Sequence, residues 1–219
     1  MSISDEPQRI KSDLLLVIAI VVVSAVLRLA FVSNASIEHF DEGVYASNMW
    51  FGAESNFQYP KRHLYAPSLL PMCIEWSIVL FGGGAIGGIL VSLVVGCLTV
   101  ALLWLVAARF FGRVAAFAVA LLACMSDFHV LFSRTALTEV MLCFWLVLSV
   151  WLIFEAIRND SYVLSVLAGV ATGLAWWTKY NGWLPIAIGF SGTIGWLLIR
   201  RRGSHVSWFR PIMLCLLIG

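Results

Sequence analysis

The chain has 219 residues, of which 61% are hydrophobic and 12% charged, and its mean hydropathy is +0.94. Soluble domains are about 45–50% apolar and about 25% charged, so this composition excludes a water-soluble fold. The net charge of +2 is small and indicates no nucleic-acid partner, and the 5 cysteines include no Cys-x-x-Cys pair that would predict a disulfide or zinc site.

Apolar segments of membrane-spanning length recur along the chain. The first, 14–32, is followed by no small-residue cleavage site and is long for a signal peptide, so we predict that it stays as a helix. Since a span needs about 20 residues, the same pattern predicts further helices over 84–107, 114–131, 140–157, 163–177 and 183–199. The fold class is therefore an all-α, polytopic transmembrane bundle.

A seventh apolar run begins at Pro211 and reaches the last residue, Gly219. Nine residues are too few to cross a bilayer. We therefore interpret 1–219 as a single transmembrane module of about seven helices. It would be the N-terminal part of a longer membrane domain, truncated in the seventh helix.

The apolar stretch 68–81 is short and contains Pro71 and Glu75, so its length alone does not show whether it crosses. Basic residues mark the cytoplasmic side. If 68–81 does not cross, nine of the 14 lysines and arginines share one side: Arg9, Lys11, Arg109, Arg113, Arg158, Arg200, Arg201, Arg202 and Arg210. We therefore predict a cytoplasmic N-terminus and an interfacial or re-entrant helix over 68–81, within a long first outer loop.

The first outer loop contains two groups of candidate site residues. In Asp41-Glu42, adjacent side chains on a helix would point about 100° apart and could serve different partners. One could be a general base while the other orients a substrate hydroxyl, or the pair could hold a divalent cation. The alternative is a helix start whose acids complement the helix dipole. Lys61 and His63 suit anionic lipid headgroups or ordinary interfacial anchoring.

The second outer segment, 126–139, contains Asp127, His129, Arg134 and Glu139 between two apolar runs. Charges at membrane depth are costly and usually face a partner or a water-filled cavity. Arg134 can bind a phosphate through two parallel hydrogen bonds. Glu139 could be a metal ligand, a hydroxyl acceptor or only the partner of Arg134, and we expect His129 to be a structural histidine with satisfied hydrogen bonds.

A third outer loop contains Lys179, which either extends to the membrane interface or neutralises a lipid phosphate.

Seven short motifs follow one another along the chain: Arg28-Leu29, the Asp-Glu-x-x-Tyr pattern at Asp41, Glu42 and Tyr45, Tyr65-Ala66-Pro67, Ala108-Arg109-Phe110-Phe111-Gly112-Arg113, the segment from Ser133 to Glu139, Gly173-Leu174, and Thr178-Lys179-Tyr180. Their order resembles that of the C-type glycosyltransferases (GT-C), and most closely the protein O-mannosyltransferases and the lipid A aminoarabinose transferases. The resemblance implies an enzyme that passes a sugar from a polyprenyl-phosphate donor to a lipid, glycan or protein acceptor on the outer membrane face.

The same resemblance implies roles for individual residues. The catalytic candidates are Asp41 as general base, Glu42 as the group that positions base or acceptor, and Glu139. The substrate-binding candidates are Asp127, Arg134, Lys179, Tyr45, Lys61 and His63, with the cations directed at the carrier phosphate. The resemblance makes no cofactor certain, and a divalent metal ion stays open.

Two departures leave the sugar and the acceptor open. Protein mannosyltransferases carry an arginine after the first loop, where this chain has the glycine-rich 82–88. Aminoarabinose transferases carry Glu-Lys where Tyr65 and Ala66 stand. The alternatives are a transporter, although the sequence shows no inverted repeat, and a non-catalytic scaffold subunit. The modest length and the lack of a targeting peptide favour a prokaryotic plasma membrane.

Overall fold

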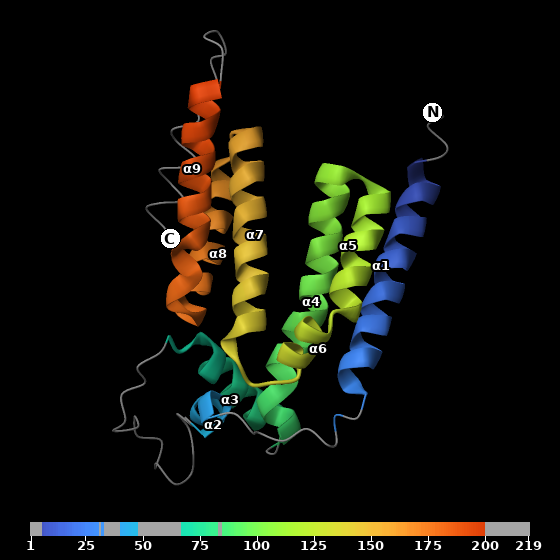
Figure 1. The fold of residues 1–219 in the computed structure, drawn as a ribbon, viewed down its shortest axis with the longest axis vertical. Coiled ribbons are helices and arrows are strands. Elements are labelled where there is room, and N and C mark those ends of the chain that lie inside the picture. The colour runs from blue at the N-terminus through green and yellow to red at the C-terminus, as the bar shows by residue number, and fades with distance from the viewer. Residues whose placement is uncertain (1–5, 31, 33–39, 48–66, 83–84, 200–219) are drawn as a thin grey trace. The chain divides into compact units, whose positions relative to one another are not determined.

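The computed structural model describes residues 6–30, 32, 40–47, 67–82 and 85–199, and within these ranges all regular structure is helical (Figure 1). The helices are α1 (Glu6–Leu29), α2 (Phe40–Ser47), α3 (Leu69–Phe81), α4 (Ala85–Phe111), α5 (Arg113–Met125), α6 (Asp127–Ser133), α7 (Thr138–Asn159), α8 (Tyr162–Thr178), the 3-10 helix η3 (Tyr180–Trp183) and α9 (Leu184–Ile199). The predicted all-α class is confirmed. Lys61, His63 and the apolar run from Pro211 lie outside the described residues.

Among the residues that the structure describes, three helices are long and apolar enough to cross a membrane: Ser12–Leu29 within α1, Ile86–Phe111 within α4, and α7. The pair α5 and α6 would make a fourth if the two formed one broken span. The helix α3 has 13 residues, fewer than a span needs. The helix α8 has 17 residues and is also short for a span.

The prediction of one unbroken helix over 114–131 is wrong. The chain breaks at Ser126, and the helices on either side are bent by 59° relative to each other. Ser126 has an extended backbone, and its hydroxyl accepts a hydrogen bond from the His129 N–H at 3.4 Å, so it caps α6. The bend directs α6 into contact with α1 and α4.

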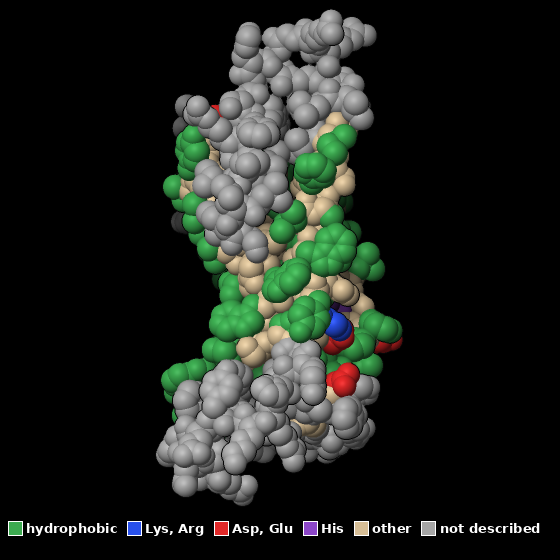
Figure 2. Space-filling view, turned by 90° about the vertical axis from the view of Figure 1, so that its left-hand side faces the viewer, with side chains coloured by type: hydrophobic (Ala, Val, Ile, Leu, Met, Phe, Trp, Pro, Cys, Tyr) green, Lys and Arg blue, Asp and Glu red, His purple; other side chains and the backbone are tan. Residues whose placement is uncertain are grey.

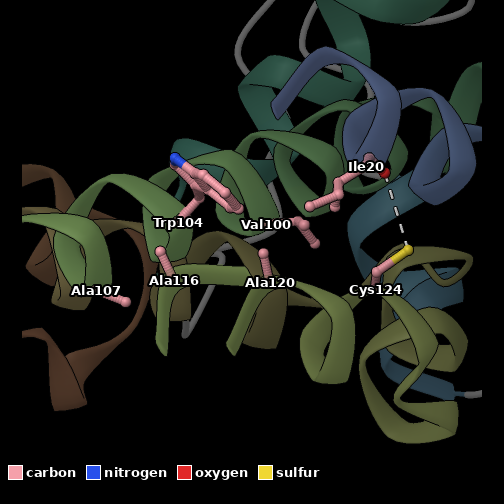
Figure 3. Packing of buried hydrophobic residues seen from close by; sticks show 7 residues of the cluster. All are labelled: Ile20, Val100, Trp104, Ala107, Ala116, Ala120 and Cys124. Atoms are coloured by element: carbon pink, nitrogen blue, oxygen red, sulfur yellow. Dashed lines mark hydrogen bonds between the residues drawn. The ribbon is translucent and has the colours of Figure 1, made fainter. Parts of the chain in front are cut away.

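The chain divides into two compact units. The first comprises 1–49 and 73–140 and is built on α1, α4 and α5. Its core is formed by residues that are nearly or fully buried, shown in Figure 3: Ile20, Val100, Trp104, Ala107, Ala116, Ala120 and Cys124. The small residues of α5 recur every four positions, so they share one face and let α5 lie close to α4.

The second unit comprises 50–72 and 141–219. Within it Ile153 of α7 packs on Ala168 of α8. The 3-10 helix η3 lies against the backbone of α8, so closely that a Cβ at Gly182 would collide with Ala175. The Trp177 indole donates a hydrogen bond to the Ser68 hydroxyl at 2.9 Å.

Apolar side chains cover much of the described surface. Most of the described side chains visible in Figure 2 are hydrophobic. Leu15 of α1, Val114 of α5 and Val163 of α8 are more than half exposed. Exposed leucine and valine along helices of this length suit contact with lipid.

Candidate functional site

The acidic pair lies at the start of α2. Asp41 and Glu42 both occupy the first turn of this helix, which is also where acids complement the helix dipole. Their environments differ, because Asp41 is exposed whereas the Glu42 side chain is only 3% exposed. Adjacent positions on a helix face different directions, which accounts for this difference in exposure.

Glu42 is held by the backbone of the segment 126–139. Its Oε1 accepts a hydrogen bond from the Ala136 N–H at 2.8 Å, and Ala136 is fully buried. A hydrogen bond from an amide to a carboxylate is stronger than one between neutral groups. The contact joins residues 94 positions apart and brings together two motifs that the sequence analysis had found separately.

The Ala136 amide is available because the chain is not helical between α6 and α7. Residue Arg134 ends α6, and its N–H bonds back to the Leu131 carbonyl at 2.9 Å. The Thr135 hydroxyl donates to the Phe132 carbonyl at 3.0 Å. The next helix begins at Thr138, so the intervening amide has no carbonyl in its own helix to bind and donates to Glu42 instead.

A second group of polar side chains connects the last turn of α1 with α6. Arg28 is completely buried, and its Nη1 donates to the carbonyl and the hydroxyl of Ser24, at 3.1 and 2.5 Å. Its Nη2 donates to His129 Nδ1 of α6 at 2.5 Å. A guanidinium has no acceptor, so Nδ1 must carry the lone pair and the ring proton resides on Nε2.

His129 also takes part in a hydrogen bond within α6. Its carbonyl accepts a hydrogen bond from the Ser133 hydroxyl at 2.5 Å. A Cβ at Gly96 of α4 would collide with Ser133, so α4 and α6 touch here with no room for a side chain. We call Ser24, Arg28, His129 and Ser133 the Arg28 cluster.

The Arg28 cluster was not predicted from the sequence. Arg28 was recognised only as part of a motif, and His129 was expected to be fully satisfied. In the described part of the chain its Nε2 is buried and has no hydrogen-bond partner. The usable signal was an arginine near the end of a membrane helix, because such residues are rare and need a partner.

The other predicted residues are dispersed. Tyr45 is half-buried in α2, Asp127 is exposed in the first turn of α6, and Glu139 is half-buried in the first turn of α7. Arg134 is half-buried two residues before Ala136. Lys179 belongs to the second unit, where its N–H bonds to the Ala175 carbonyl at 3.0 Å.

Metal ligands do not cluster within the described ranges. No three His, Cys, Asp or Glu side chains there lie close enough together to hold an ion. Asp41 and Glu42, the pair considered for a cation, differ in exposure, and Glu42 already binds an amide.

Comparison with known proteins identifies a family. A family model described as dolichyl-phosphate-mannose-protein mannosyltransferase matches residues 66–219. No curated protein and no solved structure matches the chain. The matched region contains Asp127, Arg134, Glu139 and Lys179, and it begins after Asp41 and Glu42.

Proposed function

Because the chain belongs to the dolichyl-phosphate-mannose-protein mannosyltransferase family, and is therefore a membrane glycosyltransferase of the GT-C type, we propose that it transfers a sugar from a polyprenyl-phosphate carrier to an acceptor hydroxyl on the non-cytoplasmic face. One observation carries the proposal of a site. The hydrogen bond from Ala136 to Glu42 joins the acidic pair to the second outer segment and leaves Asp41 exposed beside it.

In the proposed reaction Asp41 accepts the proton of the acceptor hydroxyl. The hydroxyl oxygen attacks the anomeric carbon, the bond from that carbon to the carrier phosphate breaks, and the phosphate leaves with the electron pair. Asp41 then releases its proton to water. The leaving group is a stable anion, so it needs cationic stabilisation and no proton donor. A single displacement inverts the configuration at the anomeric carbon.

The two carboxylates divide these roles according to their surroundings. Asp41 is exposed, so an acceptor hydroxyl can approach it. Glu42 is buried and already accepts a hydrogen bond, which suits a group that fixes its neighbour. Glu139 and Asp127 are proposed to line the same pocket.

Arg134 is the first candidate for the carrier phosphate, because it stands two residues from the amide that binds Glu42. Its guanidinium can form two parallel hydrogen bonds to phosphate. Lys179, Lys61, His63 and Tyr45 remain proposals as further substrate-binding residues.

The test is sugar transfer from a labelled polyprenyl-phosphate hexose, in membranes that contain the complete reading frame. General bases typically contribute about 10²–10⁴-fold, so Asp41→Asn should lower kcat by a factor in that range. The matched control is Asp160→Asn. Asp160 is exposed between α7 and α8 at φ 48°, a conformation that asparagine tolerates.

Three outcomes would contradict parts of the proposal. Transfer that survives in Asp41→Asn would move the base to another residue, with Glu42 and Glu139 next. A product that keeps the donor's anomeric configuration would exclude single displacement. A wild type that transfers no sugar from any carrier would contradict the proposed function as a whole.

A further inference from the structure

We propose that Arg28 is a positioning residue, which acts through His129 and Ala136 to set the orientation of the Asp41-Glu42 pair. The inference rests on the proposed function, since it concerns the same acidic pair. Arg28 touches neither carboxylate, so its influence must pass through a chain of contacts within the first unit.

The first link runs from Arg28 to α6. The hydrogen-bond partners of Arg28 in the described chain are Ser24, one turn earlier in the same helix, and His129. Serine and a neutral imidazole cannot neutralise a buried guanidinium as a carboxylate would. Instead, the planar guanidinium of Arg28 is a rigid donor that fixes the position of the His129 ring on α6.

The second link runs from His129 to Ala136. Ser133 bonds to the His129 carbonyl and is pressed against Gly96 of α4, so the far end of α6 has little freedom. Only Arg134 and Thr135 separate Ser133 from Ala136, and both are tied back to α6 by hydrogen bonds. The position of the Ala136 N–H therefore follows the position of α6.

The third link is the hydrogen bond from Ala136 to Glu42. Glu42 is buried, so water cannot readily replace this amide as its partner. Because α2 is a helix of 8 residues, fixing Glu42 also fixes the direction of the adjacent Asp41.

Arg28 is not placed to bind the carrier phosphate itself. Its side chain is completely buried, and both Nη atoms are engaged by Ser24 and His129. Its Nε lies beside Gly96, where a Cβ would be 3.1 Å away. A ligand of the phosphate would affect donor binding, whereas a positioning residue affects the chemical step.

The kinetic test is a cycle of Arg28→Gln, Glu42→Ala and the double variant in the complete chain. A misplaced catalytic group costs on the order of 10²-fold. We therefore expect Arg28→Gln to lower kcat by about that factor and to leave the donor KM unchanged. If Arg28 acts through Glu42, its substitution should cost little more once Glu42 is alanine. Multiplicative losses in the double variant, or an increase in the donor KM, would overturn the proposal.

A second measurement needs no sugar transfer. Thr138, only 2% exposed, directly follows the segment that carries Ala136. The substitution Thr138→Cys is made in a chain from which all other cysteines have been removed. The cysteine at this position should react slowly with a water-soluble maleimide, and it should react faster when Arg28→Gln is also present. The control is Thr172→Cys in α8 of the second unit, where threonine is 1% exposed and the labelling rate should not change.

Continued protection of Thr138→Cys in the Arg28→Gln variant would overturn the proposal even if activity fell. If Arg28→Gln does not accumulate, His129→Leu breaks the same contact from the other side and should give the same labelling. A wild type that transfers no sugar, together with a labelling increase, would contradict the proposed function and leave the chain of contacts supported.

Discussion

At Asp41 and Glu42, one step along a helix separates an exposed carboxylate from a buried one. The sequence could predict this divergence, because the direction of neighbouring side chains follows from helical geometry alone. It could not predict that the buried member would bind the Ala136 amide, since that contact joins two segments far apart in the chain.

The contribution of the hydrogen bond between Ala136 and Glu42 to stability can be measured by comparing the variants Glu42→Gln and Glu42→Ala. Glu42→Gln keeps a carbonyl oxygen that can accept from Ala136. Glu42→Ala leaves the buried N–H without that acceptor, which should cost about 1–3 kcal/mol of unfolding free energy. Thermal unfolding in detergent micelles should show a clearly lower midpoint for Glu42→Ala than for Glu42→Gln. Equal midpoints would mean that the hydrogen bond contributes nothing to stability.

At the scale of elements, hydropathy located most helices to within a few residues. The predicted 140–157 corresponds to α7, Thr138–Asn159, and 163–177 to α8, Tyr162–Thr178. Ser126 and Asp127 mark the break between α5 and α6, but it was missed because apolar residues resume at 130–132 and were counted with the helix before the break. Without the bend, neither the Arg28 cluster nor the approach of Ala136 to Glu42 could be foreseen.

The approach of α6 to α4 depends on Gly96. In Gly96→Ala the new methyl group would collide with Ser133, so the Ser133 side chain or the two helices must shift. Overpacking of this kind typically costs about 1–3 kcal/mol. Gly173 of α8 is the control, because a Cβ there meets nothing within 4 Å and alanine is the better helix former.

Thermal unfolding in micelles checks both glycine variants. We expect Gly96→Ala to lower the unfolding midpoint and Gly173→Ala to leave it unchanged or slightly raised. A Gly96→Ala protein as stable as the wild type would show that α4 and α6 are not in close contact in the membrane.

At the scale of the whole molecule, the sequence was enough to predict a membrane protein, because the thickness and apolar interior of the bilayer set the length and composition of the helices that cross it. The sidedness of the chain remains a prediction from the distribution of basic residues. It places the end of α7 in the cytoplasm and η3 on the outer side.

Two exposed asparagines allow a direct test of sidedness. Asn159 ends α7, and Asn181 lies in η3. As single cysteines in intact cells, Asn181→Cys should react with an impermeant maleimide, whereas Asn159→Cys should react only after the membrane is permeabilised. The reverse pattern would invert the predicted topology and place Asp41 on the cytoplasmic side.

The contact between Arg28 and His129 also has a consequence for the order in which the protein is made. The two residues are separated by 101 positions, and ribosomes add about 5–20 residues per second, so α1 leaves the ribosome about 5–20 s before its partner. During that interval a guanidinium in the last turn of α1 can reach the headgroup region by extending its long side chain. Only when α6 has been synthesised and has folded against α1 does the charge gain a site inside the protein. In nascent chains that end before α6, we therefore expect the position of α1 to be less fixed than in the finished protein.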